Sequence, residues 1–196
     1  GKFTQKQKEI YAVVLDAQLK ANETIKTGME YRKVHNLACC QITAGLMALG
    51  LMRGDVNEAV AAGAHALFMP AGLGHMMGLD VHDMEDLGED YVGYTNTIRR
   101  SSQFGMSHLR LARTLEPGFV VTVEPGIYFI PELIDQWKTE GKFEDFIDYN
   151  KVEDYRDFGG IRIEDDVLVH DAGKRVLGKP IAKTVAEVET LSSQIS

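Results

Sequence analysis

The sequence predicts one domain of the α+β class, spanning residues 1–196, in which helices come first and short strands follow. Apolar residues recur at helical spacing through residues 4–28 and again through about 33–49. Residues 119–130 and 160–177 instead hold short runs of β-branched and aromatic residues, separated by turn sequences. With 196 residues, of which 44% are hydrophobic, the chain can bury one sizeable core.

Three helices are expected in the first third of the chain. Thr4 and Gln7 form a capping-box pattern at the start of the first, which runs until Gly28. The second covers about 33–49. The third is short and fits DVNEAVAAG, with Asp55 as its N-cap.

The strands that follow carry charge on one face. In VVTVEPG and GGIRIEDDVLV, side chains alternate between two faces. The apolar faces carry Val121, Val123, Ile161 and Ile163, and the polar faces carry Thr122, Glu124, Arg162 and Glu164. For a lone strand, a solvated polar face is the simpler interpretation. Two such strands beside a histidine-containing loop favour a functional site. A hairpin with DAGK as its turn ends this region, and residues 131–158 are expected to be helical or irregular.

The loop is GLGHMMGLDVHDMEDLGED, which holds His75, His82 and six acidic residues. Its glycines make a helix unfavourable. The acidic residues lack the ligand spacing of a calcium-binding loop and predict a solvated acidic lid. One imidazole and several carboxylates together suit Mn²⁺, Co²⁺, Fe²⁺ or Zn²⁺, and two such ions can support hydrolysis.

Composition narrows the remaining possibilities. The formal charge of −8 argues against nucleic acid or an anionic membrane surface as a partner. The sequence shows no signal peptide and no membrane-spanning run, which predicts a cytoplasmic protein. Cys39 and Cys40 are expected to be small apolar residues without a disulfide, and His35 a packed or surface residue of a helix. No role is assigned to the other histidines outside the loop, which are His65, His108 and His170.

GLGHMMGLDVHD, VVTVEPGIY and GGIRIEDDVLV, in this order, resemble the catalytic domain of the Xaa-Pro peptidases, which are aminopeptidase P and prolidase of the pita-bread metallopeptidase family. The resemblance implies a curved antiparallel sheet with helices on its outer face. It also implies two divalent metal ions, most often Mn²⁺, with Co²⁺, Zn²⁺ and Fe²⁺ as alternatives. The reaction would be metal-dependent exopeptidase cleavage of peptides with proline at the second position.

The resemblance also implies roles for individual residues. His75 would bind one metal ion, and Glu124 would bind metal and transfer a proton. Glu164 would bridge two ions, and His82 would hold the substrate. Arg162 would lie beside Glu164, where an arginine can orient a carboxylate and lower its pKa.

Two features depart from the family pattern. Ala71 stands where family members commonly have a histidine. The family also uses two aspartate ligands upstream of the first long helix, and this sequence starts with that helix. We therefore expect a catalytic domain without its first strands, inactive or nearly so by itself. An exposed sheet edge of this kind could pair two chains into a homodimer.

Three other interpretations remain open at this point. The first is a prolidase, which takes dipeptides only. The second is a pita-bread module that binds peptides or proteins without catalysis. The third, a methionine aminopeptidase or creatinase relative, fits less well because GLDVHD resembles the proline-specific branch more closely.

Overall fold

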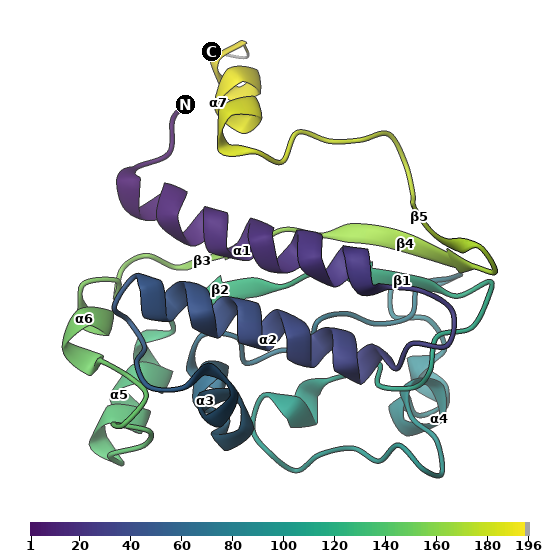
Figure 1. Ribbon diagram of the computed structural model, residues 1–196, viewed down its shortest axis with the longest axis horizontal. Coiled ribbons are helices and arrows are strands. Elements are labelled where there is room, and N and C mark those ends of the chain that lie inside the picture. Colours follow the sequence, from purple (N-terminus) through teal and green to yellow (C-terminus); the bar gives the residue numbers. More distant parts are fainter. Residues whose placement is uncertain (195–196) are drawn as a thin grey trace.

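The computed structural model describes residues 1–194 and has two long, adjacent helices lying across short strands (Figure 1). The helices are α1 Gln5–Thr24, α2 Tyr31–Ala48, α3 Val56–Ala62, α4 Glu89–Gly93, α5 Pro131–Thr139, α6 Tyr149–Glu153 and α7 Val185–Gln194, with 3₁₀ turns η1 Ala64–Leu67, η2 Glu85–Leu87 and η3 Met106–His108. The strands are β1 Val120–Val123, β2 Gly126–Tyr128, β3 Gly160–Arg162, β4 Asp165–His170 and β5 Gly173–Val176.

The first helix begins where its capping box predicts. Thr4 Oγ1 accepts from the Gln7 backbone N–H, and Gln7 Oε1 accepts from the Thr4 N–H at 2.8 Å. The helix ends at Thr24, before Gly28, because Ile25 is already extended. Its apolar face is buried as its periodicity predicts.

The second and third helices also agree with the sequence pattern. Helix α2 starts two residues earlier than expected, at Tyr31. Helix α3 is capped by Asp55, whose side chain accepts from the N–H groups of Asn57 and Glu58, and it stops at Gly63, whose φ of 94° suits glycine. Residues 131–158 contain α5 and α6 joined by a turn, as expected for a helical or irregular excursion.

The strands form two antiparallel ladders that share one register. In the first, β1 pairs with β4 and β4 with β5; in the second, β2 pairs with β3. The pairs Val123↔Asp165 and Gly126↔Arg162 lie on one continuous alignment. Continued across the gap between the ladders, this alignment places Glu124 opposite Glu164. The gap coincides with Pro125, which has no N–H to donate.

The predicted hairpin is shorter than the sequence pattern suggested. Strands β4 and β5 form it, with Asp171 and Ala172 between the last pair, His170↔Gly173. Residues 160–162 were expected to lie in the same hairpin, but they form β3 and pair with β2. The sequence pattern could not reveal this because both arrangements keep the same alternation of side chains.

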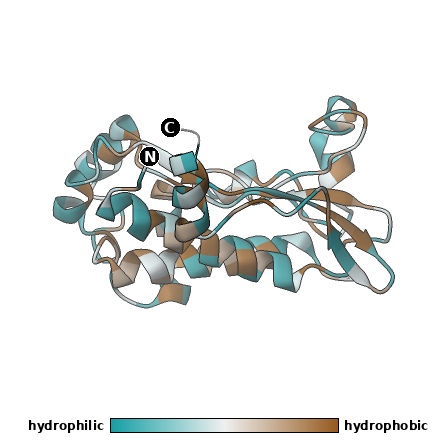
Figure 2. Ribbon diagram, turned by 90° about the horizontal axis from the view of Figure 1, so that it is seen from above, coloured by the Kyte–Doolittle hydropathy of each residue, from teal (hydrophilic) through white to brown (hydrophobic). Residues whose placement is uncertain are grey.

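The core lies between the helices and the strands. Helix α1 packs against α2 and contacts β1, β2 and β3. Hydrophobic and hydrophilic segments alternate along the helices, as expected for elements with one buried and one exposed face (Figure 2). At the other side of α1, α7 returns to the N-terminal end, where Lys8 pairs with Glu189 at 3.0 Å (Figure 1). Cys39 is buried, Cys40 is partly buried, and both are free thiols, as expected.

Candidate metal centre

The histidine loop is held against the free edge of β1. Thr122 N–H donates to the carbonyl of His75 at 3.0 Å, and Glu124 N–H donates to that of Leu73 at 2.8 Å. Met77 N–H donates to the carbonyl of Val120 at 2.9 Å. The segment 73–77 thus lies antiparallel to β1 although its composition does not resemble a strand. This pairing brings His75 next to the carboxylate that follows β1.

Gly74 permits this close approach. A Cβ at this position would overlap the carbonyl oxygen of Thr122 and lie 2.5 Å from Tyr31 Oη. Both groups are held in place, because Tyr31 Oη donates to the Thr122 carbonyl oxygen at 2.5 Å. Any side chain at residue 74 would therefore push the loop away from β1.

We expect Gly74→Ala to lower the stability of the chain by about 3 kcal/mol, as overpacking against fixed backbone does. The midpoint of thermal unfolding, followed by circular dichroism, should fall by roughly 6 to 12 °C. Ala71→Ser, at the neighbouring exposed position, is the control and should change stability by less than about 0.5 kcal/mol. An unchanged midpoint in Gly74→Ala would mean that the loop is not held as described.

The structure brings all the predicted ligands together. His75 Nε2 lies 3.1 Å from Glu124 Oε1, and the Thr122 hydroxyl donates to the same oxygen at 2.9 Å. Arg162 Nη1 lies 3.3 Å from Glu124 Oε2, and its Nε lies 3.7 Å from Glu164 Oε2. The polar faces of the two strands therefore meet at one cluster, and Thr122 is buried in it rather than solvated.

His82 lies next to this cluster. Its ring centroid is 4.3 Å from that of His75, and the two rings are perpendicular. Both rings line a cavity of about 520 Å³, together with Glu124 and Arg162. Ala71 also lines the cavity, at the position where family members commonly have a histidine. The cavity has room for a small peptide beside the carboxylates.

Burial and neighbouring charges shift the pKa values in the cluster. Burial alone would raise the pKa of Glu124, but hydrogen bonds from His75 and Thr122 outweigh it and lower the pKa. Burial alone would lower the pKa of His75, but contacts with Glu124 and with the Met76 carbonyl raise it. Arg162 lowers the pKa of Glu164, as expected, but burial and the charge of Glu124 raise it by more, so the net shift is upward.

These observations fit a site for divalent cations. His75 Nδ1 donates to the Met76 carbonyl at 2.8 Å, which directs Nε2 toward Glu124, and metal-binding histidines are commonly oriented in this way. The charge of Glu124 raises the pKa of Glu164, and a cation bound by both carboxylates would relieve this repulsion. One imidazole nitrogen and two carboxylates are a donor set that Mn²⁺, Zn²⁺, Co²⁺ and Fe²⁺ accept.

Four residues of the cavity wall were not anticipated from the sequence, namely Glu89, Ser107, His108 and Arg110. The lid is also less solvated than expected. Glu85 pairs with Arg110, and Arg100 pairs with Glu89 at 2.5 Å and with Asp90 at 2.7 Å. The available signal was the complementary charge of Arg100 and Arg110, which follow the end of the acidic run at Asp90 by about 10 and 20 residues.

Three comparisons place the chain among known proteins. The model of metallopeptidase family M24 matches residues 1–171. The Xaa-Pro dipeptidase of Mus musculus is 41% identical over 189 residues, which are 96% of this chain and 37% of that protein. The structure of Pseudomonas aeruginosa aminopeptidase PepP superposes with a TM-score of 0.72 at 36% identity, over 98% of this chain and 36% of that one. The structure of zinc-substituted Escherichia coli aminopeptidase P in complex with product superposes with a TM-score of 0.72 at 34% identity. The match covers 100% of this chain and 36% of that one.

The chain therefore spans little more than a third of the length of these proteins. Their fold agrees with the predicted pita-bread arrangement of a curved antiparallel sheet covered by helices. Within residues 1–194, no helix is both long enough and apolar enough to cross a membrane.

Proposed function

The chain belongs to metallopeptidase family M24, and from this premise we propose that it forms part of the catalytic domain of an exopeptidase that hydrolyses Xaa-Pro bonds. The observation that carries the proposal is the cluster of His75, Glu124 and Arg162 at the wall of one cavity, with His82 beside it and Glu164 in contact with Arg162. The type that we predict is an Xaa-Pro aminopeptidase, which removes the residue before proline.

Each residue of the cluster has a part in this proposal. His75 Nε2 and the carboxylates of Glu124 and Glu164 would hold two divalent metal ions, which polarise a carbonyl and activate water when bound. Glu124 accepts a proton at Oε and passes it to the leaving nitrogen of proline. Arg162 keeps the Glu124 carboxylate in place, because its guanidinium lies 3.3 Å from Oε2. His82 is exposed in the cavity wall, where its imidazole can donate to the substrate carbonyl.

The 196-residue chain alone holds three of the five ligands that the family pattern uses. We propose that two aspartates, in a portion of the protein upstream of these residues, complete the site. Isothermal titration of this chain with Mn²⁺ should then show weak binding, with a Kd in the millimolar range, because two anionic ligands are missing. Titration of the longer protein is the matched control. Tight two-site binding by the 196-residue chain would contradict this part of the proposal.

The test of the function is release of the N-terminal residue from an Xaa-Pro-Yaa tripeptide by the longer protein, with added Mn²⁺. We expect cleavage that a chelator stops and that renewed Mn²⁺ restores. A matched Xaa-Ala-Yaa tripeptide should be cleaved far more slowly. Absence of cleavage in a folded protein that holds both aspartates would contradict the proposal and favour the non-catalytic binding module.

A second candidate is an Xaa-Pro dipeptidase. It is favoured by the mouse relative, whose name is that of a dipeptidase and which is 41% identical to this chain. The two enzymes differ in whether the substrate extends past proline. Cleavage of Xaa-Pro but not of Xaa-Pro-Yaa would therefore identify the dipeptidase, and cleavage of the tripeptide the aminopeptidase.

Three further expectations accompany the proposal. Manganese is the proposed metal, although the E. coli aminopeptidase P also takes zinc. The formal charge of −8 agrees with a cytoplasmic location and argues against nucleic acid or a membrane surface as a partner. A homodimer would form through the sheet edge that is expected to be exposed without the first strands, and a monomer mass by light scattering at micromolar concentration would exclude it.

A further inference from the structure

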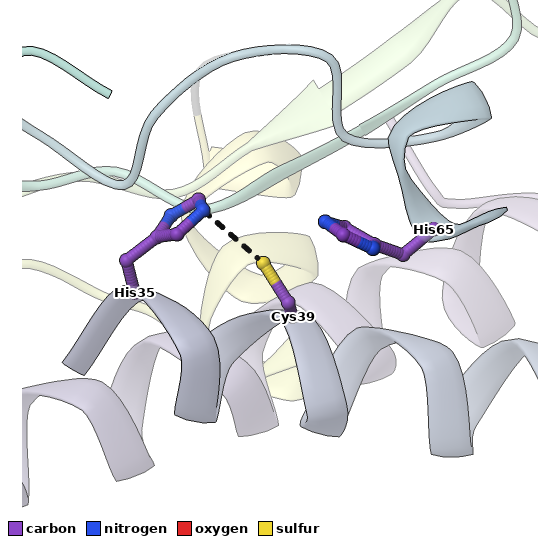
Figure 3. Close-up of side chains that lie close together, drawn as sticks. All are labelled: His35, Cys39 and His65. Atoms are coloured by element: carbon purple, nitrogen blue, oxygen red, sulfur yellow. Dashed lines mark hydrogen bonds between the residues drawn. The ribbon is translucent and has the colours of Figure 1, made fainter. Parts of the chain in front are cut away.

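A second group of metal-binding side chains lies in the core, apart from the cavity. His35 and Cys39 are four residues apart on one face of α2, and His65 reaches toward them from η1 (Figure 3). One donor atom of each of the three residues lies within 4.8 Å of those of the other two. The turn at Gly63, with its φ of 94°, directs η1 back onto α2 and so brings His65 into the group.

The hydrogen-bonding groups of this cluster are poorly satisfied. His65 is 1% exposed, and neither of its ring nitrogens has a hydrogen-bond partner among residues 1–194. His35 is equally buried, and its Nδ1 has no partner in the same part of the chain. Its Nε2 faces two sulfur atoms, Cys39 Sγ at 3.4 Å and Met106 Sδ at 3.1 Å. Sulfur is a weak hydrogen-bond partner, and unpaired buried polar groups cost free energy, so this arrangement requires another explanation.

The separations suit a bound metal ion. Metal–nitrogen bonds of about 2.0 Å and metal–sulfur bonds of about 2.3 Å put neighbouring ligand atoms of a tetrahedral site about 3.3 to 3.8 Å apart. The distance from His35 Nε2 to Cys39 Sγ, 3.4 Å, falls in this range. The three donor atoms lie within 4.8 Å of one another, so binding one ion requires the His65 side chain to move by about 1 Å. A rotation about its χ angles can supply this movement.

The donor set and its surroundings indicate which ion would bind. A thiolate and a thioether are soft donors and the two imidazoles are borderline donors, a set that suits copper(I) better than hard cations. The flanking residues Val34, Ala38, Ala64 and Ala66 are buried and apolar, so a net charge in the site would be costly. Copper(I) with one thiolate and neutral ligands is electrically neutral, whereas zinc(II) with the same ligands would leave one positive charge buried.

We propose that His35, Cys39 and His65 bind a single copper(I) ion, with Met106 as a weak fourth ligand. The ion forms a bond to Cys39 Sγ, and the thiol proton leaves to solvent, so the site gains no net charge. Met106 is partly exposed in η3, and the ion would enter along this side. None of these four residues belongs to the proposed peptidase cluster, so the two proposals can fail separately.

The test is competition for copper(I) under anaerobic, reducing conditions, with the coloured complex of copper(I) and bathocuproine disulfonate as donor. The 196-residue chain should remove one equivalent of copper(I), seen as loss of the colour. Cys39→Ser should weaken the binding at least tenfold, because a hydroxyl is a poor ligand for this ion. Cys40→Ser is the matched control, since the neighbouring thiol lies outside the cluster, and it should still take one equivalent.

Two more variants separate the site from its alternatives. His65→Leu should no longer bind one equivalent of copper(I). Its fold should be unchanged, which the near-ultraviolet circular dichroism of Trp137 reports. Glu124→Gln should still bind one equivalent of copper(I), because that carboxylate belongs to the proposed peptidase cluster. Either removal of no copper(I) by the unmodified chain or removal of a full equivalent by Cys39→Ser would overturn the proposal.

Discussion

Replacing Glu164 with glutamine in a protein that carries this chain with the complete ligand set should reduce Xaa-Pro peptidase activity by about three orders of magnitude or more. Glu164 stands opposite Glu124 in the shared register of the two ladders, and the charge of Glu124 raises the pKa of Glu164. An amide in its place has no charge and cannot bridge two cations. The measurement is kcat/KM for an Xaa-Pro substrate together with metal content per chain, which should fall as well.

The control for this variant is Glu116→Gln. Glu116 is an exposed glutamate that pairs with Arg113 at 2.9 Å, and it does not line the cavity. This replacement should leave kcat/KM within about twofold of the unmodified value, because exposed ion pairs contribute little to stability. Both variants should have the circular dichroism spectrum of the unmodified protein. Undiminished activity in a folded Glu164→Gln protein would rule out the bridging role.

Acid should destabilise the metal-free chain well above the pH at which carboxylates titrate. Burial lowers the pKa of His35 to about 3 and that of His65 to about 4, from an ordinary value of 6.5. Below pH 6.5 the unfolded chain binds protons at both residues, whereas the folded chain does not, so stability falls as the pH falls. The loss is about 1.4 kcal/mol per pH unit for each histidine, until the pH reaches the folded pKa values.

Between pH 6.5 and 4.5 these two histidines dominate the dependence of stability on pH, and only Glu164, whose pKa is raised in the fold, opposes them in part. His75 has a raised pKa in the fold, so it is protonated in both states below pH 6.5 and contributes no slope there. Glu124 has a lowered pKa, and its contribution is lost only as the pH falls below the ordinary glutamate value of 4.5. Across the window, the two buried histidines should therefore remove roughly 3 to 5 kcal/mol of stability.

Urea unfolding at several pH values measures this effect. His65→Leu should halve the slope of stability against pH, because leucine fills the apolar site and does not titrate. His170→Gln, at a partly exposed position on β4, is the matched control and should leave the slope unchanged. If the slope in His65→Leu equals that of the unmodified chain, the acid sensitivity originates elsewhere.

Local signals in the sequence were sufficient for most of the secondary structure. The capping box at Thr4, the N-cap at Asp55 and the alternation around Glu124 are interactions within a few residues, and each appears in the structure as predicted. The motifs also predicted the family, because GLGHMMGLDVHD, VVTVEPGIY and GGIRIEDDVLV lie in a fixed order.

Tertiary pairing determined which segments of the chain lie side by side. The loop of residues 73–77 lacks β-forming residues, and only the free edge of β1 and the absence of a side chain at Gly74 make it extended. The separation of β3 from the β4–β5 hairpin depends on Pro125 in another segment. Arg162 also affects Glu124 more than Glu164, a balance of distances and burial that no sequence pattern contains.

The sequence by itself predicted the first three helices, the strand segments and their polar faces, and it indicated His75, Glu124 and Glu164 as candidate ligands. Only the tertiary structure determined the His35–Cys39–His65 cluster, because these residues share no motif. Their approach requires the packing of η1 on α2. The physical reason is one of range: caps and side-chain alternation act between near neighbours, whereas burial and pKa depend on every segment that packs around a group.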